Sequence, residues 1–370
     1  MFLLQRSEKK WPLDALMSIT QIKFHVTDQR DKVYALLGLA AENGDNSPGQ
    51  LRPDYNIHVT QLYQKVARFL LEQNGSLAML TRTRGTRDSL DRLRRQHDIG
   101  NVPSWVPDWS DFSVFNREIR TSLSWIEYSD TSKSPYLGFP KHYNASKGLE
   151  LKVHDTGDAS VLRVNGMRVD EIAQVINLNE EALSRDGFNQ NFALQIERIY
   201  DAAIKLLAGN DILSWTKHFI KVTTAEQHQL CGSSWDQTFK DGTSYLHDLI
   251  SSNENHMSAW AKSGGAQAMD HLHDLSIDGK PGKYAALAQN FCFNRSFMIT
   301  KEKRMGIGPS DTAVGDVVAV IPGGAVPYIT RQGEAGWTFV GESYIDGLMA
   351  GEAVREYQQG IIKEETFDFH

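Results

Sequence analysis

The spacing of apolar residues changes along this chain, and that change limits the possible folds more than any other feature. From residue 59 to residue 70 the apolar positions recur at i, i+3, i+4 and i+7, which is the stripe of an amphipathic helix. From residue 149 to residue 176 they alternate, with a turn signal at residues 157–158, as in a β-hairpin. From residue 291 to about residue 340 the chain is β-rich again. Helical and strand periods occupy separate stretches, so we predict an α+β fold.

Two more helices are predicted near the N-terminus. Residues 12–24 carry apolar positions at near-helical spacing, and a second helix follows Asp28, which is a favourable N-cap residue. Gly38 would end that second helix in a left-handed conformation. Asn56 is the predicted N-cap of the helix over residues 59–70.

Length and composition favour two or three structural units. The chain has 370 residues, of which 41% are hydrophobic, enough for a sizeable buried core. Residues 1–130 are predicted to be a mainly helical region with a Trp/Pro corner, and residues 131–290 to combine the hairpin with a helical region. Residues 291–370 are predicted to form a small, β-rich, barrel-like C-terminal domain with a hairpin turn at residues 323–324.

The charge balance argues against two classes of partner. Lys and Arg total 39 and Asp and Glu total 46, which gives a net charge of −7. A mildly acidic protein has no general attraction to nucleic acid or to anionic lipid, so neither is expected as a partner. No stretch approaches the ~20 apolar residues that cross a bilayer, and no secretory signal is evident at the start. Cys231 and Cys292 are expected to be buried and reduced in a cytoplasmic protein.

Residues 102–110, VPSWVPDWS, cannot form a regular helix. Each proline lacks an amide donor and pushes the preceding residue toward extended geometry. Trp105 and Trp109 flank Pro107, and two readings are open: a packed structural corner, which we favour, or the lining of an apolar ligand cleft.

Arg30 and Asp31 lie at the expected start of the second helix and also have two readings. An arginine can bind anions and an aspartate can act as a base. The favoured reading is structural, with Asp31 serving the helix dipole and Arg30 paired to a carboxylate such as Asp54 or Asp108.

Other chemical motifs are weak. Residues 270–274, DHLHD, have metal-ligand residue types, but on a helix the two histidines would point about 200° apart, and we expect a solvated polar loop. The GIGP run at residues 306–309 lacks the rest of a phosphate loop and is expected to form a turn. The arginines between residues 82 and 95 are diluted by acidic residues and suggest an exposed loop. No metal, cofactor or catalytic constellation is predicted.

Three separated segments resemble fungal heterokaryon-incompatibility (HET) proteins. Residues 25–40, HVTDQRDKVYALLGLA, are similar to the family's "ATDPRDKVYALLGLA" run, with Gln29 where proline is usual. Pro53-Asp54-Tyr55 and the box at residues 103–110 follow in the family's order. The third segment runs from residue 295 to residue 353 and closes on GLMAGEA.

The resemblance implies the region that follows the family's signature domain, including only its tail. A "YxALSYxWG"-like run, which normally comes first, does not precede Trp11, so we expect a short or truncated form. The signature domain is thought to resemble folds some of which consume NAD. Its candidate catalytic positions would lie upstream of Met1, so that activity is not carried over.

Two functional hypotheses follow. The resemblance implies a regulatory or recognition role in fungal self/nonself recognition, with protein partners. The alternative is a small-molecule-binding enzyme of the cyclase or isomerase type, with an aromatic cleft near Trp105, Trp109, Trp125 and Tyr128. Its polar residues would be Arg30, Asp31 and Asp108.

Overall fold

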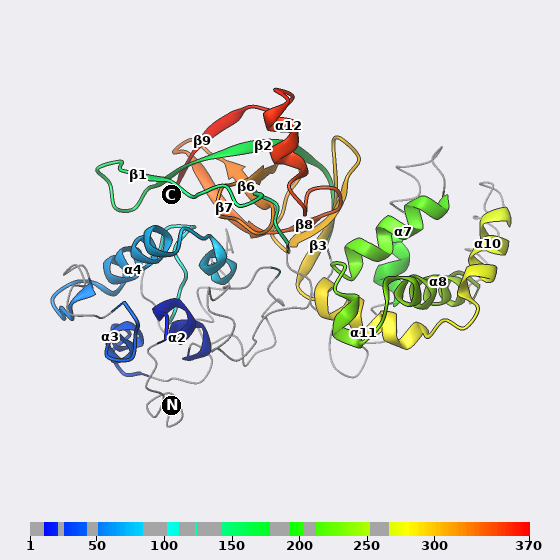
Figure 1. The fold of residues 1–370 in the computed structure, drawn as a ribbon, viewed down its shortest axis with the longest axis horizontal. Helices are drawn as coiled ribbons and strands as arrows, with labels where there is room; N and C mark the ends of the chain where they lie inside the picture. Colours follow the sequence, from blue (N-terminus) through cyan, green and yellow to red (C-terminus); the bar gives the residue numbers. More distant parts are fainter. Residues whose placement is uncertain are drawn as a thin grey trace.

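A computed structural model shows three regions arranged around a shared hydrophobic core (Figure 1). It describes residues 11–20, 26–42, 51–83, 102–110, 123, 143–177, 193–200, 202, 212–251 and 266–370. The N-terminal helices and the middle helices lie on two sides of a β-barrel formed mainly by the C-terminal strands (Figure 1). The predicted α+β fold class, with a helical N-terminal region, a mixed middle and a barrel near the C-terminus, is confirmed.

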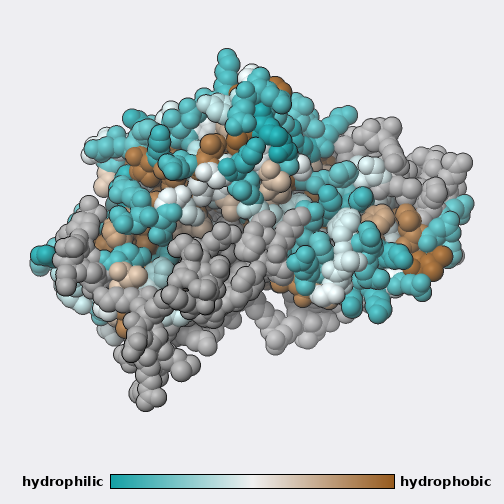
Figure 2. Space-filling model, in the orientation of Figure 1, coloured by the Kyte–Doolittle hydropathy of each residue, from teal (hydrophilic) through white to brown (hydrophobic). Residues whose placement is uncertain are grey.

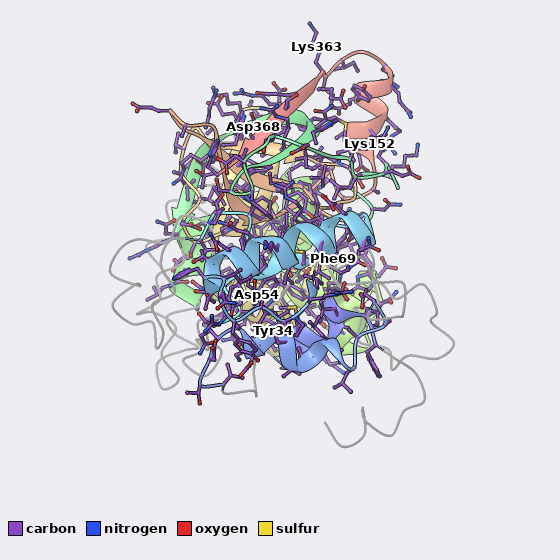
Figure 3. All side chains as sticks on the ribbon, turned by 90° about the vertical axis from the view of Figure 1, so that its left-hand side faces the viewer. Tyr34, Asp54, Phe69, Lys152, Lys363 and Asp368 are labelled. Atoms are coloured by element: carbon purple, nitrogen blue, oxygen red, sulfur yellow. The ribbon has the colours of Figure 1, made fainter. Side chains whose placement is uncertain are left out.

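The described part of the N-terminal region contains three α-helices and a 3-10 helix. They are α2 (Leu13–Thr20), α3 (Asp31–Leu37), α4 (Val59–Asn74) and η2 (Ala78–Arg82). The apolar stripe predicted for α4 is buried at Leu62, Tyr63, Val66, Phe69 and Leu70. Figure 3 shows α4 between the barrel and the α2/α3 layer, so both of its long sides have packing partners.

The ends of these helices differ from the sequence predictions. Helix α3 begins at Asp31 rather than beside Asp28, and the Asp28 carboxylate instead accepts the Arg30 amide in the turn before the helix. Gly38 keeps a right-handed conformation, with φ −64°, so the predicted left-handed stop is wrong.

Helix α4 is capped by His58, not by Asn56. The His58 ring accepts the Thr60 amide, and Gln61 accepts the His58 amide in return. This is the reciprocal arrangement of a capping box, with an imidazole in place of the usual hydroxyl.

The middle region is mainly helical. Its described residues include α7 (Ile212–Thr223), η5 (His228–Cys231), α8 (Trp235–Ser251), α10 (Ala266–Ser276) and α11 (Pro281–Cys292). Residues 193–200 are also helical. The polar loop predicted at residues 270–274 is wrong, because these residues lie within α10. No group of three metal-ligating side chains gathers anywhere in the described residues.

The strands are β1 (Val153–His154), β2 (Leu162–Asn177), β3 (Arg295–Thr300), β4 (Met305–Pro309), β5 (Val317–Val320), β6 (Tyr328–Gln332), β7 (Trp337–Glu342), β8 (Tyr344–Ile345) and β9 (Glu364–Phe369), with the short helix α12 (Glu352–Gln358) before β9. Strands β1 and β2 pair antiparallel, which confirms the predicted hairpin. The turn predicted at residues 323–324 lies between the antiparallel strands β5 and β6, as expected.

Five strands close into a barrel. The pairing runs β5, β6, β7, β9 and β2, and β2 pairs with β5 to complete the ring. The β7 and β9 strands are parallel, whereas the other pairs in the ring are antiparallel. Strand β2 can pair within the barrel and also continue beyond it, because it is long and its register shifts near residues 168–170 and 172–174. Its second half pairs with β3, from which the sheet continues to β4 and β8.

The unit boundaries at residues 130 and 290 stay predictions. Within the described residues, β2 belongs to the predicted middle unit but forms part of the barrel. The N-terminal region is tied to the barrel as well. Ser104 donates its amide and its hydroxyl to the His370 carbonyl, and the Leu77 amide donates to the Gly323 carbonyl.

The turn predicted at residues 306–309 is also wrong, because these residues form β4. Glycine is required in β4 because the neighbouring strand leaves no room for a Cβ atom. A Cβ at Gly306 would lie 2.7 Å from the Tyr344 carbonyl oxygen of the neighbouring strand β8.

None of the helices in the described parts of the chain is long and apolar enough to span a bilayer. On the face in Figure 2, hydrophilic residues surround small, separate hydrophobic areas. Cys292 is buried as predicted, whereas Cys231 is partly exposed, and both are free.

Candidate functional site

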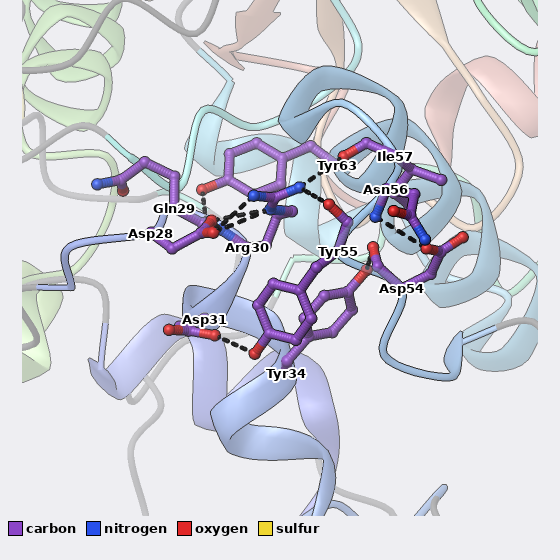
Figure 4. Close-up of polar contacts among 10 residues, drawn as sticks. All are labelled: Asp28, Gln29, Arg30, Asp31, Tyr34, Asp54, Tyr55, Asn56, Ile57 and Tyr63. Atoms are coloured by element: carbon purple, nitrogen blue, oxygen red, sulfur yellow. Dashed lines mark hydrogen bonds and ion pairs between the residues drawn. The ribbon is translucent and has the colours of Figure 1, made fainter.

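The predicted residues Arg30 and Asp31 lie in a polar cluster where the start of α3 meets the loop before α4 (Figure 4). The Arg30 guanidinium donates from Nε and Nη2 to the Asp28 carboxylate at 2.9 and 2.7 Å. Its Nη1 donates to the backbone carbonyls of Tyr55 and Ile57. The side chain therefore fastens the loop to the start of the helix.

Two tyrosines also connect the loop to the helix. Tyr34, on α3, donates its hydroxyl to the Asp54 carbonyl at 2.8 Å. Tyr55, in the loop, donates its hydroxyl to the Asp31 carboxylate at 2.6 Å. The two rings meet edge to face, with centroids 5.2 Å apart. Loop and helix are thus joined by contacts in both directions.

Hydrogen bonds and charge set the titration of these groups. The Arg30 guanidinium lowers the pKa of the Asp28 carboxyl, and that carboxylate raises the pKa of Arg30. The bond to Asp31 raises the pKa of the Tyr55 phenol. Each nitrogen of the guanidinium already has an acceptor, so the cluster suits a rigid polar surface better than an anion-binding site. The prediction that Arg30 pairs with Asp54 or Asp108 is wrong, because its carboxylate partner is Asp28.

Tyr63, on α4, connects this cluster with the Trp/Pro corner. Its hydroxyl donates to the Gln29 carbonyl at 3.1 Å, and its ring packs edge to face on Trp109 at 5.1 Å. Burial raises the pKa of the Tyr63 phenol, and the charges of Asp108 and Asp28 add to the effect. One buried tyrosine therefore contacts both segments that the sequence singled out.

Trp105 is buried in the same corner but contacts a different part of the fold. Its side chain has no exposed surface, and Nε1 donates to the Ser160 carbonyl at 2.9 Å. The Arg68 guanidinium lies 5.6 Å from the ring centroid and also donates to the Val161 carbonyl. Trp105 thereby joins the corner to α4 and to the start of β2.

Asp108 closes a local turn. Its Oδ1 accepts the amide and the hydroxyl of Ser110, and the residue is buried. Trp109 is only 4% exposed. The other aromatic residues proposed for a cleft, Trp125 and Tyr128, lie outside the described residues.

Sequence reasoning missed the tyrosines of this cluster and a buried ion pair elsewhere. Tyr55 was visible only as part of the Pro53-Asp54-Tyr55 box, and Tyr63 looked like an ordinary core residue. Arg295 pairs with Glu342 at 3.0 Å with both side chains buried, and it also donates to the Phe291 carbonyl. The two partners are 47 residues apart, so no local spacing could have indicated the pair.

Comparison with known proteins adds two findings. A family described as "Het-6 beta-barrel domain" matches residues 200–361, which include α7 through β8 and α12. "Heterokaryon incompatibility protein 6, OR allele" of Neurospora crassa is 25% identical over 369 aligned residues, covering 88% of this chain.

The chain is thus a distant homologue of that protein, and it spans about half the length of this curated relative, 49%. No solved structure matches the chain.

Proposed function

We propose that this protein has a regulatory or recognition role in fungal self/nonself recognition. Its Neurospora crassa relative is named a heterokaryon incompatibility protein. The supporting observation is that the similarity covers 88% of the chain. Coverage this long cannot be confined to the part that matches the barrel domain, so the likeness extends well beyond it. On this proposal the chain corresponds to the region that follows the HET signature domain and includes only its tail.

The candidate site supports recognition more than catalysis. Arg30, Asp31 and the tyrosines around them satisfy one another and hold a loop in place. An enzyme built on Trp105 and Trp109 would need their faces open to a ligand, yet both indoles are almost fully buried. We therefore advance no second function.

The proposal is tested by heterokaryon formation. Two strains of a filamentous fungus with complementary nutritional requirements are paired, and one of them expresses the chain. Expression should reduce the yield of prototrophic heterokaryons in some genotype pairings and leave it unchanged in others. A Leu62→Ala variant, which removes a buried α4 side chain, is the control for loss of fold. Equal yields with and without the chain in every pairing would contradict the proposal.

A further inference from the structure

Helix α10 contains the DHLHD run at residues 270–274, and one of its histidines lies beside a histidine of another helix. The His273 ring packs next to the His247 ring of α8, with ring centroids 5.2 Å apart and an angle of 49° between the ring planes. Helices α8 and α10 are neighbours in the middle region (Figure 1). Because the two histidines come from different helices, the local pattern of α10 could not indicate this pair.

The two helices hold these histidines in a fixed register. Leu246 and Leu272, which directly precede the two histidines, are fully buried in the hydrophobic core. About one turn before His247, Thr243 donates its hydroxyl to the Leu275 carbonyl of α10 at 3.2 Å. Packing and this hydrogen bond therefore fix the backbone beneath both imidazoles.

Burial does not explain why two imidazoles lie together here. His273 is exposed, and His247 is only partly buried. Contact between the rings removes little apolar surface from water, and two imidazolium charges at this distance would repel each other. Two neutral imidazoles, by contrast, are ligands that suit zinc, copper and nickel ions.

The distance between the rings fits one shared ion. A Zn–N bond is about 2.0–2.1 Å long and each ring nitrogen lies about 1.2 Å from its ring centre, so two imidazoles on one tetrahedral ion have centres roughly 5 Å apart. The observed separation is 5.2 Å. Asp248 Oδ1 lies 3.6 Å from His247 Nδ1, a position that favours a proton on Nδ1 and leaves Nε2 as the metal ligand.

The charges on the two helices favour a cation. Three exposed carboxylates lie within three residues of a histidine of the pair: Asp248, Asp270 and Asp274. Across α8 and α10 the sequence has one lysine, Lys240, and no arginine. Lys240 precedes His247 by two helical turns, about 10 Å along the axis. Lys280 follows α10, and its amide bonds Asp241, almost two turns before His247.

We infer that His247 and His273 bind one divalent transition-metal ion of the Zn²⁺ type, with water completing its coordination. Two protein ligands agree with the finding that no group of three metal-ligating side chains gathers in the described parts of the chain. Magnesium and calcium prefer oxygen ligands and do not suit an imidazole pair. The ion bridges α8 and α10, so it stabilises the folded chain by binding it in preference to the unfolded chain. This inference is independent of the proposed recognition role.

The test titrates Zn²⁺ into the purified full chain in competition with a chromophoric chelator. His247→Ala and His273→Ala should each weaken the tightest site at least tenfold, because each removes one of its two protein ligands. His154→Ala removes an exposed histidine from β1, and this matched control should leave the affinity unchanged. Mg²⁺ should not compete with Zn²⁺ for the site.

Melting curves separate loss of the site from loss of the fold. Without metal, His273→Ala should melt with the unchanged chain, because the side chain that it removes is exposed. Zn²⁺ should raise the melting temperature of the unchanged chain and of His154→Ala, but not that of His247→Ala or His273→Ala. Amide hydrogen exchange in α8 and α10 of the unchanged chain should slow when Zn²⁺ is added.

Three results would overturn the inference. One is an unchanged chain that binds no Zn²⁺. Another is a tight site that survives either histidine substitution, since the ion would then lie elsewhere. The third is a melting temperature that Zn²⁺ raises as much in His273→Ala as in the unchanged chain.

Discussion

Asp14 is a buried carboxyl in an unfavourable place for a charge. It lies in the first turn of α2, where its Oδ1 accepts the Ala15 amide and its Oδ2 accepts the Asn74 side-chain amide. Burial raises the pKa of Asp14 from 3.8 to about 6, and the charge of Glu42 adds to the rise. The bond from Ala15 acts in the opposite direction but does not offset the burial.

This shift predicts how stability depends on pH. Between about pH 4 and pH 6 the folded state binds more protons at Asp14 than the unfolded state, so Asp14 makes stability fall as pH rises through that window. A shift of about two pKa units corresponds to at most about 3 kcal/mol. Asp14→Asn keeps an oxygen for the Ala15 amide, and its NH2 group can donate to Asn74 once the Asn74 side-chain amide turns over. The substitution should therefore stabilise the protein at pH 7.5 by about 1–3 kcal/mol, with a gain that shrinks toward pH 4.

Urea unfolding at several pH values measures this effect. Glu334→Gln, at an exposed position, is the matched control and should not change the pH dependence. A gain from Asp14→Asn that is as large at pH 4 as at pH 7.5 would show that burial of the charge is not its cause.

At the scale of elements, β3, β4 and β8 lie close enough together to require glycine. A Cβ at Gly306 would meet the Tyr344 carbonyl oxygen at 2.7 Å, and a Cβ at Gly308 would meet the end of the Met298 side chain, also at 2.7 Å. A strand carbonyl cannot move without its hydrogen-bonded neighbours, whereas a methionine methyl group can rotate away. Although the two Cβ contacts are equally short, we therefore expect the two substitutions to destabilise the protein by different amounts.

Gly306→Ala should lower the melting temperature more than Gly308→Ala. Overpacking of a rigid contact typically costs about 1–3 kcal/mol, and we expect Gly306→Ala at the upper end and Gly308→Ala at or below the lower end. Thermal melts of the two variants, made at the same protein concentration, compare them directly. The reverse order would mean that β8 moves more readily than Met298.

The Trp/Pro corner is the second element that can be tested. Trp109 is buried against Tyr63, and truncation of a buried aromatic side chain typically costs about 3–5 kcal/mol. Trp109→Ala should lower both the melting temperature and the soluble yield. If Trp109→Ala melts within error of the parent, the corner is not structural and the small-molecule hypothesis becomes the better one.

At the scale of the whole molecule, local patterns in the sequence predicted some helices and strands but not others, since residues 270–274 lie in α10 and residues 306–309 in β4. The stripe on α4 and the β1/β2 hairpin followed from the spacing of apolar residues alone. Helix ends were less predictable. The N-cap of α4 is His58 rather than Asn56, because the His58 side chain accepts a backbone amide of the first turn and the Gln61 side chain accepts the His58 amide. The pairing that closes the barrel could not be predicted, because β2 joins β5 and β9 across long stretches of sequence. Met167 pairs with Val320, 153 residues away, and Asn165 pairs with Thr366, 201 residues away.

In the candidate site, too, residues of interest could be predicted from the sequence but their contacts could not. The sequence indicated Arg30, Asp31, Trp105 and Trp109 as residues of interest, but their partners depend on the fold. Tyr63 faces Gln29 on one side and Trp109 on the other only because α4 packs between the two segments. A periodic pattern can place Tyr63 in a core but cannot say which residues it will contact.

Survival of fused cells measures most directly whether this chain has the proposed role in recognition between fusing cells. Cells of a strain that expresses the chain are fused with cells of a panel of genotypes and stained with a vital dye. The account predicts that the fraction of dead fusion cells rises in particular pairings only when the chain is expressed and folded. The same death fraction in every pairing, with and without the chain, would contradict it.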